Sequence, residues 1–75
     1  MPDPPVQQAF RGFKERYSHV VGVQSIERGF HEREPCLVAL VDPGFGSDRL
    51  PAAFFGLRIR LNGGGHVYPA TGDPV

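Results

Sequence analysis

The sequence predicts a small two-layer α+β domain, with an N-terminal helix packed on a three- or four-stranded, mainly antiparallel sheet. Three observations predict it. Apolar residues near the start recur at helical spacing, the segments after residue 19 are rich in β-forming residues, and breaks rich in glycine and proline separate those segments. The 75 residues leave room for one domain, residues 1–75.

The first expected element is a helix with an apolar stripe. Four side chains spaced by four, three and four residues lie on one side of it: Val6, Phe10, Phe13 and Tyr17. Asp3 is the expected N-cap, and Pro4 suits the first turn. Gly12 weakens an isolated helix by about 1 kcal/mol relative to alanine. We therefore expect the stripe to pack on Val21, Val23, Leu37 or Val38, and Ile59.

Two strands come next and should form an antiparallel hairpin. The first covers residues 20–26, with Gly22 marking a bulge or a close approach of the backbone. Residues 28–34 are polar and contain glycine, which predicts a turn. Residues 36–41 are apolar at every position, as in a strand covered on both faces. We expect this second strand to be central in the sheet.

The remaining residues predict short elements separated by turns. Residues 42–48 hold many helix and strand breakers and predict a loop, while 50–56 predict one or two helical turns ended by Gly56. Residues 57–61 alternate apolar and arginine residues, as in a strand with one buried face. The glycine run that follows predicts a turn into a short strand at 66–68. Residues 69–75 are expected to be a frayed tail.

Composition argues against two classes of partner. Eight basic residues balance eight acidic ones, so the chain lacks the positive field that dominates nucleic-acid binding. The longest apolar run is residues 36–41, far below the roughly 20 residues that span a bilayer. The first residues also lack the basic and apolar regions of a secretory signal. We expect a cytoplasmic protein that binds neither nucleic acid nor membrane.

The residues that carry chemistry do not form a recognisable catalytic or metal site. There is one cysteine, Cys36, and no two of the three histidines have the helical spacing typical of zinc ligands. Cys36 with a histidine is the only conceivable nucleophile pair, but it starts an apolar strand, where a free cysteine behaves as a small hydrophobic residue. The glycine-rich stretches lack the lysine and the following helix of a phosphate loop. We expect no enzyme activity, no metal and no cofactor.

Aromatic residues give the leading functional hypothesis, an interaction module that binds a protein partner or itself. The chain has six phenylalanines, more than so small a core readily buries, and surplus exposed apolar area marks interfaces. Phe45, Phe54 and Phe55 are the expected partner-binding residues, with Phe54 or Phe55 at the centre of a homodimer. The alternative is that most of the aromatic residues cap the ends of the core.

A second hypothesis is a domain that binds a small ligand or an anion. Arg58 and Arg60 lie two residues apart on one face of a predicted strand. With Arg28 or Arg49 nearby they would form an anion-binding patch. The competing interpretation is an ordinary solvated face of the sheet.

Residues 20–61 resemble a small domain found near the start of some bacterial trypsin-like protease relatives. The shared pattern consists of residues 20–23, Glu34-Pro35, residues 37–41, and Leu50-Pro51 ahead of residues 56–59. The resemblance implies a non-catalytic α+β module, because the protease domain itself is missing and no serine lies in a Gly-x-Ser-x-Gly setting. The chain departs from the pattern after the second strand, where Asp42-Pro43 replaces a lysine-rich end.

Overall fold

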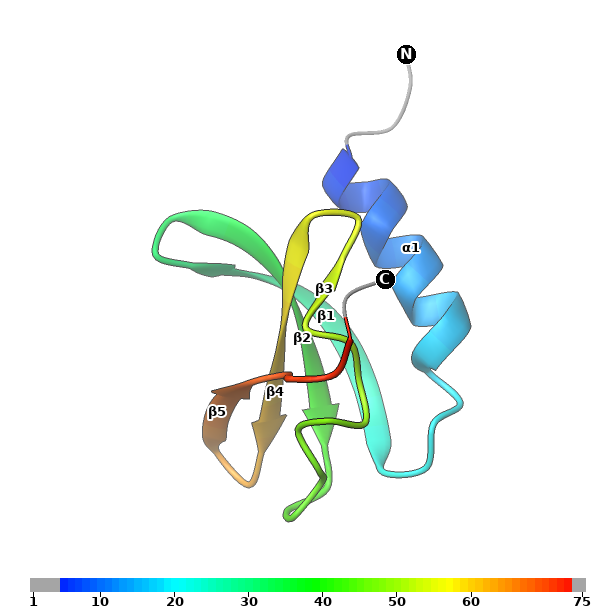
Figure 1. Ribbon diagram of the computed structural model, residues 1–75, viewed down its shortest axis with the longest axis vertical. Helices are drawn as coiled ribbons and strands as arrows, with labels where there is room; N and C mark the ends of the chain where they lie inside the picture. The colour runs from blue at the N-terminus through cyan, green and yellow to red at the C-terminus, as the bar shows by residue number, and fades with distance from the viewer. Residues whose placement is uncertain (1–4, 74–75) are drawn as a thin grey trace.

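The computed structural model describes residues 5–73 (Figure 1). Its elements in chain order are α1 (Pro5–Tyr17), β1 (Val23–His31), β2 (Glu34–Val41), β3 (Ala53–Phe54), β4 (Leu57–Gly63) and β5 (His66–Pro69). One helix packed on one mainly antiparallel sheet confirms the predicted α+β class. The expected N-cap Asp3 and Pro4 lie outside the described residues.

The sheet is mixed, and β2 and β4 form its centre. β1 and β2 form the predicted antiparallel hairpin, and β2 then pairs with β4 in parallel. On its other side β4 pairs antiparallel with β3 near its start and with β5 near its end. The central place predicted for the second strand is confirmed, because β2 lies between β1 and β4.

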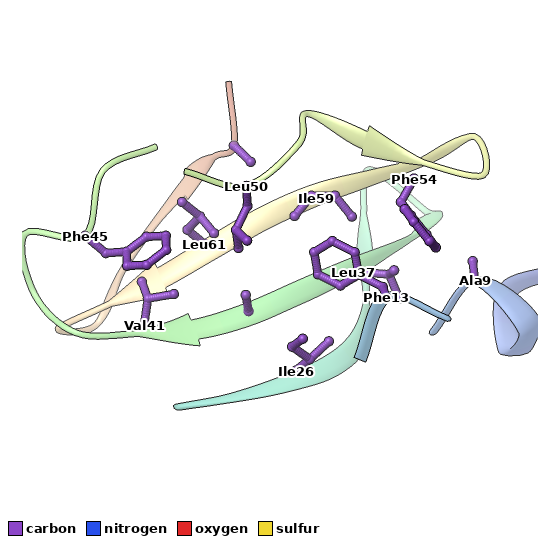
Figure 2. Packing of buried hydrophobic residues seen from close by; sticks show 12 residues of the cluster. Ala9, Phe13, Ile26, Leu37, Val41, Phe45, Leu50, Phe54, Ile59 and Leu61 are labelled. Atoms are coloured by element: carbon purple, nitrogen blue, oxygen red, sulfur yellow. The ribbon is translucent and has the colours of Figure 1, made fainter. Parts of the chain in front are cut away.

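One face of the sheet carries the core, which two segments cover (Figure 2). At one end α1 buries Ala9 and Phe13, and at the other the loop between β2 and β3 buries Phe45 and Leu50. The sheet contributes alternate residues of its strands: Ile26 from β1, Leu37, Ala39 and Val41 from β2, and Ile59 and Leu61 from β4. The cluster therefore spans several strands and both covering segments.

The first hairpin is longer than predicted and begins later. Val21 lies in the turn before β1 and is 80% exposed, so its expected packing against the helix is wrong. β1 continues to His31, where residues 28–34 were expected to form a turn. The turn consists only of Glu32 and Arg33, whose φ angles of 52° and 71° are those that a tight two-residue hairpin turn requires.

Residues 50–56 form no helix. Ala53 and Phe54 are instead the strand β3, and Phe55 and Gly56 make a tight turn into β4 with φ angles of 50° and 78°. The strand has only two residues, Ala53 and Phe54, which is too short for a strand pattern to be recognised in the sequence. Its pairing partners, Leu57 and Arg58, lie just beyond the turn. This extra strand brings the sheet to five strands, where three or four were expected.

The segment expected to fray is held in place as far as residue 73. β5 extends through Pro69, and Ala70 is buried with its N–H donated to the carbonyl of Ile59. Gly72 then exchanges two backbone hydrogen bonds with the segment before β3, to the Leu50 carbonyl and from the Ala52 N–H. The expectation of a frayed tail is wrong for residues 69–73, because this backbone closes the side of the core. Residues 74–75 lie outside the described chain.

Candidate protein-interaction site

A groove of about 580 Å³ lies between α1 and the far end of the first hairpin. We call it the Phe30 groove. Val6 and Phe10 line it from the helix, residues 26–30 line it from β1, and Pro35 closes it from β2. At its outer end Phe30 is exposed, so the groove opens to solvent there.

Strand geometry places the side chains of the groove. Residues two apart on a strand share a face, so Arg28 and Phe30 point to the same side as the core residue Ile26. The register agrees, because Arg28 pairs with the buried Leu37 and Phe30 with Pro35. Phe30 is nevertheless 80% exposed, since it lies past the end of the layer that buries Ile26. It is the most exposed aromatic side chain of the described residues.

The groove is lined by one cation, Arg28, and one carboxylate, Glu27, and the cation lies against an aromatic ring. The guanidinium of Arg28 is 5.6 Å from the centroid of the Phe10 ring, and the ammonium of Lys14 is 5.7 Å from the same centroid. Cations at this distance from a ring are attracted to its face. The Phe30 groove therefore combines apolar walls with a cation that already lies against a ring, an arrangement that suits an aromatic side chain.

The outer edge of β1 borders the groove and is unpaired. Within residues 5–73, β1 pairs only with β2, and its other side meets no strand. The strand is nine residues long and contains neither proline nor lysine, and its register shift, which protects an edge, is confined to the stretch between Val23 and Ser25. The opposite edge is different, because it consists of the short strands β3 and β5 and ends in Pro69. β1 is thus the edge that remains open to pairing.

Two of the three predicted partner-binding residues are not on the surface. Phe45 is 7% exposed and Phe54 is 4% exposed, so both belong to the core, and the expectation that they are exposed is wrong. The loop after β2 folds back over the sheet, where the backbone carbonyl of Phe45 accepts a hydrogen bond from the Tyr68 hydroxyl at 2.9 Å. Phe54 is buried because β3 points it at the helix.

Phe55 is exposed as predicted, but it stands apart from the groove. It is 67% exposed in the turn between β3 and β4. Its ring contacts that of Phe54, with the centroids 4.6 Å apart. Phe55 therefore lies on the β3 edge of the sheet, whereas Phe30 lies on the β1 edge.

Arg58 and Arg60 share a second, smaller hollow of about 250 Å³. It is also lined by Ala52, Ile59, Pro69 and Ala70, so none of its six lining residues carries a carboxylate. The register places the two arginines beside Cys36 and Val38 of β2, on the face away from the helix. Neither Arg28 nor Arg49 lines this hollow, so the structure does not add them to the pair. Arg28 lies at Phe10, and the guanidinium carbon of Arg49 lies 4.6 Å from the centroid of the Phe45 ring.

Cys36 is buried in β2, where the sequence analysis placed it. Burial raises the pKa of its thiol, and the nearby Arg60 charge opposes part of that rise. A raised pKa reduces the thiolate that a nucleophile needs. Over the described residues, no three histidine, cysteine, aspartate or glutamate side chains gather closely enough to hold a metal ion.

The Phe30 groove was not predicted from the sequence. A weak signal for it exists, since Ile26 and Phe30 are four residues apart and would share one strand face, but the charged Arg28 between them breaks the apolar alternation that predicts a strand. That signal was hidden because the glycine and charged residues of this segment predicted a turn. The helical part of the groove could not be read locally, because Val6 and Phe10 reach it only through the docking of α1.

Comparisons with family models, with curated proteins and with solved structures find no match to this chain. The resemblance to a protease-associated domain therefore stays a prediction. The helix of the described chain, α1, has 13 residues and is too short to cross a bilayer.

Proposed function

We propose that this domain is a protein-interaction module that binds an extended segment of its partner by adding it as a strand to β1. The single observation that carries the proposal is that the unpaired edge of β1 borders the Phe30 groove. An exposed edge supplies backbone hydrogen bonds, and a pocket beside it supplies side-chain selectivity, which together are the parts of strand-addition recognition.

The groove favours an aromatic or large aliphatic anchor on the added strand. Its walls include Val6, Phe10 and Phe30, and the exposed Phe30 ring loses the most water when it is covered. An anchor ring would also meet the Arg28 guanidinium, which already lies over a ring in the free domain. Anchors of this kind dominate the affinity of many interfaces.

A peptide titration tests the proposal. The probe is a library of acetylated and amidated heptapeptides with phenylalanine at the central position, followed by amide NMR of the protein. Selected peptides should shift the signals of residues 25–31 and of Val6 and Phe10. Phe30→Asp should abolish binding, while Phe55→Asp, an exposed control at the other edge, should leave it intact.

Methylation of the peptide backbone separates strand addition from simple burial of a side chain. Alternate amides of an added strand face the edge that it pairs with. N-methylation of one alternate set should therefore abolish binding, and methylation of the other set should preserve it. Equal tolerance of both sets, or shifts confined to Val38, Leu40 and Val67 on the opposite face, would disprove the proposal.

A second candidate function is the binding of a small anion by Arg58 and Arg60. It is supported by the hollow that the two side chains share and by its lack of carboxylates. Titration with inorganic phosphate should shift the signals of both arginines, and Arg58→Gln with Arg60→Gln should remove the response. Arg33→Gln, in the exposed hairpin turn, is the matched control for lost charge. A response that survives the double substitution would exclude this site.

The proposal treats the domain as non-catalytic and cytoplasmic. Burial of Cys36 supports the first part, because the thiol of the predicted cysteine–histidine pair lacks access to solvent. Activity-based thiol probes should leave the folded protein unlabelled, and rapid labelling of Cys36 would contradict it. The cytoplasmic location stays a prediction from the sequence, and localisation of the tagged protein in its host would test it.

A further inference from the structure

We infer that the strand added to β1 is β1 of a second copy of this chain, paired antiparallel about a two-fold axis at Gly29. This inference rests on the proposed strand-addition function and names its partner. It replaces the predicted dimer centred on Phe54 or Phe55, since Phe54 is buried and Phe55 lies at the opposite edge.

The shape of β1 limits where two copies can pair. The β1–β2 register shifts between Val23 and Ser25, so regular strand geometry is confined to residues 25–31. Bulged positions disrupt a pairing edge. A symmetric antiparallel pair needs the same stretch from each copy, so its axis must lie near the middle of that stretch, at Glu27, Arg28 or Gly29.

Charge selects among these three positions. An axis at Glu27 places two carboxylates directly opposite each other, and an axis at Arg28 does the same for two guanidinium groups. Like charges in directly opposite positions destabilise a strand pair. An axis at Gly29 brings no side chain opposite its own copy, because glycine has none.

The register about Gly29 also pairs complementary groups on both faces of the sheet. On the helix side, Arg28 of each copy faces Phe30 of the other, a cation against an aromatic ring. On the other side, Glu27 of each copy faces His31 of the other, a carboxylate against an imidazole. All four contacts of the two-fold pair are therefore attractive.

The same register fills the groove. Opposite Arg28, the Phe30 ring of the second copy stands between Ile26 and Phe30 of the first, on the face where the Phe30 groove opens. Each copy thus places its most exposed ring over the apolar walls of the other. A specific interface needs roughly 800 Å² from each partner, about one sixth of the 4904 Å² surface of one chain.

Light scattering tests the association. At micromolar concentration the protein should have twice the chain mass of 8.2 kDa. Phe30→Asp should remain folded by circular dichroism, since the side chain is exposed, and should raise the dimer dissociation constant by at least about 100-fold. Phe55→Asp is the matched control and should leave the dimer unchanged. A dimer that Phe55→Asp dissociates and Phe30→Asp does not would overturn the inference.

Disulfide trapping tests the register. In a Cys36→Ala background, Glu27→Cys protein mixed with His31→Cys protein should form a mixed disulfide under mild oxidation. Efficient self-crosslinking of Glu27→Cys would instead place the axis at Glu27 and refute the Gly29 register. A monomer that still binds the phenylalanine heptapeptides at β1 would refute the second copy as partner while leaving strand addition standing. A monomer that binds none of them would refute both.

Discussion

The rings of Phe13 and Phe54 pack edge to face, with their centroids 5.4 Å apart. Phe13 lies in the middle of the helix and Phe54 on the outermost short strand, so this contact ties the helix to the edge of the sheet opposite β1. Tyr17 adds a second perpendicular contact to Phe54, at 6.2 Å between centroids. The orientation of α1, and with it the helical wall of the Phe30 groove, depends on this aromatic cluster.

Truncation of Phe54 should destabilise the domain severely. Phe54→Ala removes a buried ring from this cluster and should lower the free energy of unfolding by about 3–5 kcal/mol. Phe54→Leu should lower it less and keeps the effect measurable if the alanine variant does not fold. Urea unfolding followed by circular dichroism gives both values. Phe55→Ala, the exposed neighbour, should lose about 1 kcal/mol or less, and equal losses at the two positions would contradict the assigned burial.

The hairpin turn should be open to improvement. Glu32 and Arg33 both adopt positive φ, which side chains other than asparagine and glycine resist. Replacing them by Asn-Gly should raise the free energy of unfolding by about 1 kcal/mol. Chemical unfolding measures the gain, with Pro-Gly in the same two positions as a control that should destabilise, because proline cannot adopt positive φ. A loss of stability in the Asn-Gly variant would mean that the turn has a different geometry.

Gly72 should tolerate no side chain. A Cβ atom there would overlap the carbonyl oxygen of Leu50 and approach the carbonyl of Asp48 at 3.1 Å, so backbone must move. Gly72→Ala should lower the free energy of unfolding by about 1–3 kcal/mol. It should also speed amide exchange at Ala52, whose N–H bonds to the Gly72 carbonyl. Asp73→Ala, one residue on and exposed, should be neutral. A neutral Gly72→Ala would show that this segment is not held against the core.

Stability should fall in mild alkali because of Cys36. Burial raises the pKa of the folded thiol, so the unfolded chain releases its proton at lower pH than the folded chain. The contribution of the thiol to the free energy of unfolding is complete below the pKa that the thiol has in the unfolded chain, about 8.5. It decreases as the pH rises above that value. Thermal unfolding between pH 7 and pH 10 should show this decline, and Cys36→Ala should reduce it. A slope identical in both proteins would show that other groups cause it.

The sequence predicted the parts of the fold that local periodicity specifies. The stripe of α1 and the apolar run of β2 are strong local patterns, and both the helix and the central strand are confirmed. The limits of β1 were missed because Gly29 and the charged residues around it resemble a turn. Gly29 and these charged residues are tolerated in β1 because this strand of the sheet buries side chains on one face only.

The candidate site was harder to predict because distance in sequence separates its walls. Phe45 sits in a loop that is typical of surfaces, and only the return of that loop over the sheet shows that it is buried. Phe30 looked similar in sequence and is exposed. Phe45 is buried because its loop folds back over the sheet, whereas no segment of the described chain covers Phe30. Sequence periodicity carries no information about which of the two is covered.

The parallel pairing of β2 with β4 has a consequence for the order in which the chain folds. The β1–β2 and β4–β5 hairpins each close across two residues, which takes microseconds. The parallel pair forms only after the 15 residues 42–56 have closed as a loop, and such non-local closure slows folding. We therefore expect both hairpins to form early and to meet late. Only that late meeting brings Leu37 beside Ile59 and creates the centre of the core.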